Sequence, residues 1–243
     1  MSSRLLASLT VIILLAAFAS EATRLPLSEV EALKEIGKSL GKNDWNFSVD
    51  PCSGELGWAK HPDLDSSQNA VKCGNCTSDN TTCHVVTIVL KALNLSGVLP
   101  RELVKLPHLL ELSLTSNYFS GELPGTLAKL TTLKDFRIGD NLFTGSIPNF
   151  VQNWIHLRNL YIQASGLDGP IPFGIAVLTN MTELRISDLN GTKVSTFPPL
   201  SNMRYLRTLM LTSCNIIGSL PEYLGTMINL TILDLSFNKL SGE

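Results

Sequence analysis

The stretch LTSNYFSGELPGTLAKL, residues 114–130, combines an asparagine, a glycine and a proline with leucines at uneven spacing. It follows neither the alternation of a half-buried strand nor the 3.6-residue period of an amphipathic helix. The arrangement returns every 24 residues, with one 25-residue unit. Its equivalent first positions are Val85, Leu109, Leu133, Leu157, Met181, Leu206 and Leu230. Such self-similarity indicates a protein built from stacked structural repeats.

Within each unit, counted from zero at that first position, the residue types predict one coil. Apolar residues at offsets 3 and 5 predict a short strand with one face inward. Asparagine at offset 8 is expected to point inward and bond the backbone, while glycine at offset 12 and proline at offset 15 turn the chain back. The last apolar pair, at offsets 18 and 21, is expected on a loose helical turn. The residues are Asn117, Asn141 and Asn238; Gly97, Gly121, Gly145, Gly169, Gly218 and Gly242; and Pro100, Pro124, Pro148, Pro172 and Pro221.

A single unit cannot bury its own apolar face, so the units must stack into a solenoid. The sequence therefore predicts an α/β solenoid over residues 85–243, with six full units, a truncated seventh and parallel strands on the concave face. Unit five replaces the glycine and proline signature with SDLNGTKVSTFPPL and is expected to distort the coil, either as a contact loop or as a harmless irregularity.

Residues 23–84 are expected to form a cap over the first coil. SEVEALKEIGKSLG predicts a helix with Ser28 as N-cap, Glu31 completing a capping box, and Gly41 ending it. Trp45 and Trp58 are expected to pack inside this cap.

Several features indicate the secretory pathway. Residues 1–22 have a basic start, an apolar run and small residues, as in a signal peptide; the alternative is an N-terminal membrane anchor. Seven glycosylation sequons occur, and four of the five cysteines are clustered, which suggests disulfides in an oxidising compartment. The sequons are at Asn46, Asn75, Asn80, Asn94, Asn180, Asn190 and Asn229, and the clustered cysteines are Cys52, Cys73, Cys76 and Cys83.

The pairing of these four cysteines is left open, since three connectivities exist. The spacing at residues 73–84 could also be drawn as a zinc site, but it lacks a matching second half, so disulfides are preferred and no metal is expected. Cys214, the fifth cysteine, falls at the inward offset 8. It is interpreted as a buried free thiol rather than a reactive or intermolecular one.

The pattern LxxLxLxxNxLxGxIPxxLxxL resembles the plant type of leucine-rich repeat. The segments EVEALKEIGKSLGKNDWNFSVDPCSG, NCTSDNTTCHVVTIVLKALNLSGVLP and LNGTKVSTFPPLSNM are similar to one group of plant receptor-like serine/threonine kinases. This resemblance implies an N-terminal ectodomain whose parent continues into a malectin-like domain, a membrane helix and a kinase domain, none of which is in these 243 residues.

No catalytic motif is found among hydrolase, phosphate-binding, metalloprotease or kinase signatures, so no catalytic residue or cofactor is predicted. The formal net charge of −2 gives no basic face for nucleic acid. A solenoid binds on its concave surface, where an Arg–Tyr–Arg row beside an acidic and polar row predicts a peptide, protein or glycan contact. The bland alternative is a solvated face whose charges pair with one another. The candidate ligand-binding residues are Asp135, Arg137, Asn159, Tyr161, Gln163, Glu183 and Arg185.

The favoured function is therefore extracellular ligand sensing, with a co-receptor as a further partner and membrane attachment only through the rest of the parent. The location is the outer face of the plasma membrane or the apoplast. The alternative is a free secreted leucine-rich-repeat binding or inhibitor protein. The end of the chain inside unit seven, without a C-terminal cap, is expected to leave an apolar edge and favours a fragment of the receptor.

Overall fold

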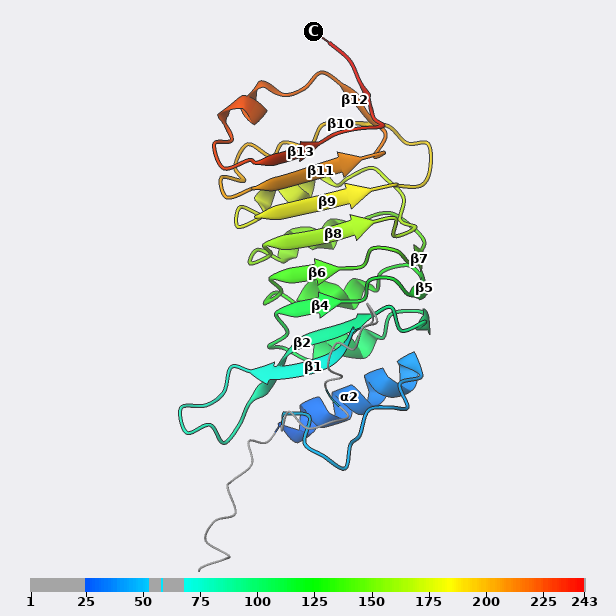
Figure 1. Ribbon diagram of the computed structural model, residues 1–243, viewed down its shortest axis with the longest axis vertical. Helices are drawn as coiled ribbons and strands as arrows, with labels where there is room; N and C mark the ends of the chain where they lie inside the picture. Colours follow the sequence, from blue (N-terminus) through cyan, green and yellow to red (C-terminus); the bar gives the residue numbers. More distant parts are fainter. Residues whose placement is uncertain (1–24, 53–57, 59–67, 243) are drawn as a thin grey trace, which may run out of the picture.

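A computed structural model describes residues 25–52, 58 and 68–242. Its main feature is an eight-stranded sheet that runs along the whole stack, and Figure 1 shows these strands ascending the long axis above helix α2. The first two strands are antiparallel and all later neighbours are parallel. In spatial order the strands are β1 (Gln68–Gly74), β2 (His84–Lys91), β4 (Glu111–Ser113), β6 (Asp135–Arg137), β8 (Asn159–Gln163), β9 (Glu183–Ser187), β11 (Thr208–Thr212) and β13 (Ile232–Asp234).

The sheet keeps the register of the repeat. Leu112 pairs with Phe136, Phe136 pairs with Leu160, and none of the three is exposed to solvent. Burying one such side chain stabilises the fold by about 1.5–3 kcal/mol. The predicted parallel solenoid is confirmed, and its core is the continuous row of these inward positions.

The asparagines at offset 8 join each coil to the preceding one, as predicted. Asn117 accepts the N–H groups of Leu93 and Leu95 through Oδ1, at 3.1 Å each, and donates from Nδ2 to the Leu90 carbonyl at 2.7 Å. Asn141 is likewise buried and accepts the Phe119 N–H at 3.1 Å. One side chain therefore satisfies backbone groups that the strand end leaves inside the protein.

Units without this asparagine use the main chain instead. Ser165 stands at offset 8 of unit four, and its carbonyl accepts the Phe143 N–H at 2.9 Å. The close approach requires Gly166, which has φ of +87°; a Cβ there would lie 2.4 Å from the Phe143 carbonyl oxygen. In unit six Cys214 is buried and its Sγ lies 3.4 Å from the Ile186 carbonyl oxygen, as expected for an inward thiol.

The side opposite the main sheet carries short 3-10 helices. Each follows the repeated proline, which acts as N-cap with extended backbone. The predicted helical turn is thus confirmed wherever the proline recurs. These helices are η1 (Arg101–Lys105), η2 (Gly125–Lys129), η3 (Asn149–Asn153), η4 (Phe173–Val177) and η5 (Glu222–Thr226).

The repeated glycines adopt positive φ at five of the six predicted positions. Gly169 is the exception: it precedes Pro170 and does not adopt positive φ, because a following proline favours extended backbone.

Two small sheets follow the bends. One contains β3 (Ser96–Gly97), β5 (Tyr118–Gly121) and β7 (Leu142–Phe143), and the other contains β10 (Ser195–Thr196), β12 (Ile216–Gly218) and β14 (Lys239–Leu240). Unit five keeps this bend through β10 but has no 3-10 helix in its described residues. There the Leu200 N–H and the Pro198 carbonyl bond the hydroxyl of Tyr223 in the next coil. The expected irregularity therefore lies on the convex side.

At the N-terminal end, helix α2 (Leu27–Leu40) covers the first coil and ends at Gly41, in a left-handed conformation. The predicted capping box is wrong. Pro26 is the N-cap, and no side chain caps the helix. Glu31 instead bonds Lys34 at 2.7 Å, one turn further along, so it does not reach back toward Ser28.

The cap is closed by aromatic packing and two disulfides. Trp45 and Trp58 are buried with ring centroids 5.4 Å apart, as predicted for cap packing. Disulfides join Cys52 to Cys73 and Cys76 to Cys83. The proposed signal peptide lies outside the described residues, and within those residues no helix is both long and apolar enough to cross a bilayer.

Candidate functional site

The predicted site residues come together on three neighbouring strands, β6, β8 and β9. The parallel register places Asp135, Asn159 and Glu183 in one row. It places Arg137, Tyr161 and Arg185 in a second row, two residues further along each strand. We call these six residues the concave patch. Gln163 is half-buried at the end of β8, opposite Ser187 of β9 and two residues beyond Tyr161 on the same strand.

Tyr161 is the centre of the patch because an arginine lies on each side of its ring. The guanidinium carbon of Arg137 is 4.5 Å from the ring centroid and that of Arg185 is 5.1 Å away. Both distances are within the range in which a cation is attracted to an aromatic face. The three side chains therefore brace one another without any ligand.

Carboxylates of the first row hold the arginines in place. Asp135 accepts two bonds from Arg137, from Nε at 2.7 Å and from Nη2 at 2.6 Å. Glu183 Oε2 accepts Arg185 Nη2 at 2.7 Å and the Tyr161 hydroxyl at 2.6 Å. The alternative interpretation, a solvated face whose charges pair with one another, is therefore correct about the pairing.

These contacts change the acidity of the groups involved. Burial, and then the hydrogen bond to Glu183, raise the pKa of Tyr161 to about 12. The bond from Tyr161 lowers the pKa of Glu183 below its ordinary value. The bond to Asp135 raises the pKa of Arg137. These pKa shifts favour a neutral Tyr161 phenol, a charged Glu183 carboxylate and a charged Arg137 guanidinium at neutral pH.

The pairing still leaves donors for a ligand. The Nη1 groups of Arg137 and Arg185 have no acceptor among the described residues, and the arginine side chains are 36% and 31% exposed. They lie on either side of a braced aromatic ring. Binding to such a surface costs little side-chain ordering, because the rotamers are already fixed.

The structure also assembles a group that the sequence did not reveal. Glu29 of α2 is 3% exposed, and its two oxygens bond His84 Nδ1 at 2.5 Å and the Val85 N–H at 2.8 Å. The His108 ring is tilted by 36° against the His84 ring, with the two ring centroids 3.8 Å apart. A carboxylate oxygen of Glu29 and one ring nitrogen of each histidine lie within 4.8 Å of one another. Since both carboxylate oxygens already have protein partners, we interpret the group as a clamp between the cap helix and β2.

The sequon asparagines are distributed around the stack rather than on its concave strands. All seven are exposed, and none lies within a strand of the main sheet. Asn94 and Asn190 follow strand ends, whereas Asn180 and Asn229 precede strand starts. A glycan on any of these four would emerge at a lateral edge of the solenoid.

Comparison with known proteins agrees with the repeat analysis. The Leucine Rich Repeat family matches residues 108–130, 205–227 and 229–243. A probable leucine-rich repeat receptor-like serine/threonine-protein kinase of Arabidopsis thaliana is 48% identical over 110 residues, covering 44% of this chain and 10% of that protein. A second probable kinase of this kind, from the same organism, is 45% identical over 101 residues, covering 40% of this chain and 10% of its own length.

These matches correspond to about a tenth of the length of the curated relatives. Among solved structures, the Arabidopsis receptor kinase HAESA, in complex with the peptide hormone IDA and the co-receptor SERK1, superposes with a TM-score of 0.62 at 26% identity. The superposition covers 88% of this chain and 38% of that one.

Proposed function

We propose that this chain, whose leucine-rich repeats are related to those of plant receptor-like serine/threonine kinases, is a non-catalytic ligand-sensing ectodomain module. Its location is the secretory pathway and then the outer face of the plasma membrane, attached through the remainder of a parent receptor. The parent would continue into malectin-like, membrane and kinase segments. The ligand would be an extracellular peptide, protein or glycan, and a co-receptor would complete the complex.

The concave patch carries this proposal. It combines tyrosine and arginine, the residue types that dominate binding energy at interfaces, with partners that fix their rotamers. The seven sequon asparagines all lie outside the strands that form this face. A ligand could approach the patch even with every acceptor glycosylated. The solved complex of HAESA with a peptide hormone supports the same class of ligand.

The test is a binding screen of the secreted, glycosylated protein against synthetic extracellular peptides and oligosaccharides, read by surface plasmon resonance. For any ligand found, Tyr161→Ala and Arg185→Ala should each weaken binding by about tenfold or more, as hot-spot residues do. Tyr118→Ala is the matched control, because Tyr118 is exposed and lies in β5, outside the concave strands.

Thermal melts of each variant separate lost binding from lost folding. A ligand whose affinity is unchanged by both concave variants would reject the patch. The parent receptor is tested separately, by determining the transcript sequence beyond codon 243. An open reading frame without membrane and kinase segments would reject the receptor proposal and leave the binding data intact.

A further inference from the structure

A second surface runs along the edge where the strands of the main sheet begin. We define this strand-start strip as residues 131–134, 155–158, 179–182, 204–207 and 228–231, one segment from each of five successive coils. The strip contains four basic side chains and no acidic one, although the chain as a whole has 21 acidic and 19 basic residues. Its exposed basic residues are Lys134, Arg158, Arg204 and Arg207.

The positive charge of the strip is not neutralised locally. In the part of the chain that the structure describes, none of these four side chains forms an ion pair. The nearest acidic residues along the strands, Asp135 and Glu183, are already bonded to the arginines of the concave patch. The arginines of the concave patch therefore form ion pairs, whereas among the described residues the basic side chains of the strand-start strip do not.

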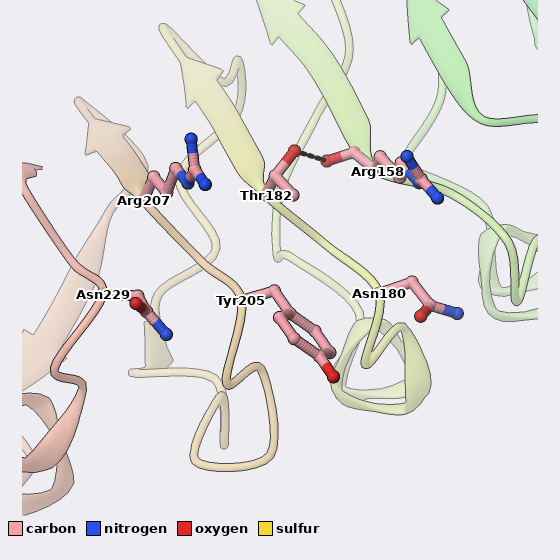
Figure 2. A pocket seen from close by; sticks show the side chains of 6 residues that line it. All are labelled: Arg158, Asn180, Thr182, Tyr205, Arg207 and Asn229. Atoms are coloured by element: carbon pink, nitrogen blue, oxygen red, sulfur yellow. Dashed lines mark hydrogen bonds between the residues drawn. The ribbon is translucent and has the colours of Figure 1, made fainter.

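A trough lies in the middle of this strip and has a volume of about 390 Å³. Figure 2 shows two rows of side chains, with Tyr205 in the centre of the second. The Tyr205 ring is 62% exposed. The first row contains Arg158, Thr182 and Arg207, and the second contains Asn180, Tyr205 and Asn229.

We propose that the trough binds an acidic oligosaccharide, independently of the concave patch. Arg158 and Arg207 would bond carboxylates of the sugar, since planar guanidinium groups match carboxylate geometry. The Tyr205 ring offers an exposed apolar face on which a sugar ring can stack, and the Thr182 hydroxyl oxygen can accept a bond from a sugar hydroxyl. The amides of Asn180 and Asn229 already donate to the carbonyls of Ile155 and Arg204. An acidic peptide fits less well, because none of the six residues that line the trough is aliphatic.

Coil spacing adds to this argument. Successive parallel strands lie about 4.8 Å apart, so Arg158 and Arg207, which start strands two coils apart, present charges roughly 10 Å apart along the stack. Lys134 continues the line one coil beyond Arg158. A linear polymer with regularly spaced carboxylates can contact all three, whereas a single carboxylate cannot.

The experiment measures binding of a galacturonate oligomer to the secreted, glycosylated protein by isothermal titration calorimetry. The fully methyl-esterified oligomer and a poly-glutamate peptide are compared with it. We expect binding of the acidic oligomer only, weakening as salt is raised. The double variant Arg158→Gln/Arg207→Gln should weaken binding by about tenfold or more. Tyr205→Ala should also weaken binding of the acidic oligomer, but the dependence of binding on salt concentration should not change.

The matched control is Arg101→Gln/Lys129→Gln, which removes the same charge from exposed residues of η1 and η2 on the convex side. If this control weakens binding as much as the trough variant, the interaction is general charge attraction and the proposal is wrong. Equal binding of poly-glutamate would also overturn it, in favour of an acidic protein partner. Binding that appears only after Asn180→Gln/Asn229→Gln would show that glycans fill the trough in the secreted molecule, which again overturns it.

Discussion

Replacing Asn141 by leucine tests whether the buried asparagines hold adjacent coils together. The side chain is 6% exposed and makes four bonds to the backbone. Oδ1 accepts the N–H of Phe119 at 3.1 Å, and Nδ2 donates to the carbonyls of Leu114, Ile138 and Gly139 at 3.0 Å each. Leucine has nearly the same shape but offers no polar atom.

The expected cost follows from the groups left unpaired. A buried donor without an acceptor costs about 1–3 kcal/mol, and carbonyls that lose a bond add to this. Phe119 is fully buried, so water cannot replace the lost acceptor at its N–H. Because the leucine methyl groups recover some free energy by burial, we expect Asn141→Leu to lower the free energy of unfolding by about 3 kcal/mol.

Urea denaturation followed by circular dichroism measures this change, with Asn153→Leu as control at an exposed position at the end of η3. A loss of that size corresponds to a fall in Tm of about 6–12 °C for a domain of this length. If Asn141→Leu stays within about 0.5 kcal/mol of Asn153→Leu, the asparagine bonds do not stabilise the stack and the reasoning is refuted.

Three further predictions concern single positions. Gly166→Ala should lower the free energy of unfolding by about 2 kcal/mol or more, because its Cβ would lie 2.4 Å from the Phe143 carbonyl oxygen. Gly225→Ala, with open space around it, should change that free energy by less than about 0.5 kcal/mol in urea denaturation. Burial raises the pKa of Cys214 to about 12, so iodoacetamide at pH 8 should label it only in urea; labelling of the native protein would contradict its burial. The raised pKa of Tyr161 favours the neutral phenol in the folded state, so its contribution to stability should be complete below pH 10 and lost as pH rises through about 12; a Tyr161→Phe variant lacking that alkaline loss in urea titrations at each pH would support this, and an identical profile would not.

Repeat phasing explains why so much of the fold and the candidate patch could be predicted. Once the period is known, residues 24 apart must be neighbours, so the contact of Arg137, Tyr161 and Arg185 follows from counting. The same counting places Asn117 and Asn141 at equivalent inward positions.

The features that were missed depend on single contacts outside the period. Glu29 meets His84 across 55 residues, between a helix and a strand with no shared repeat, so no spacing in the sequence indicates it. The helix begins at Leu27 instead of after Ser28, because Pro26 takes the N-cap position and Glu29 of the first turn is buried. The trough was not predicted, because its residues precede the strands and lie outside the strand offsets that face outward on the concave surface.

The pattern of buried asparagines has a consequence for the concave patch. Each of these asparagines accepts a backbone N–H of the preceding coil. Asn117 bonds the first coil, Asn141 the second and Asn238 the sixth. The patch occupies the third, fourth and fifth coils, whose successors carry Ser165, Leu189 and Cys214 at the inward position. These three coils are joined to their successors by main-chain bonds, and the amides of Asn190 and Asn215 add bonds away from the inward position. The surface proposed to receive a ligand therefore lies where, among the described residues, no buried amide is shared between one coil and the next.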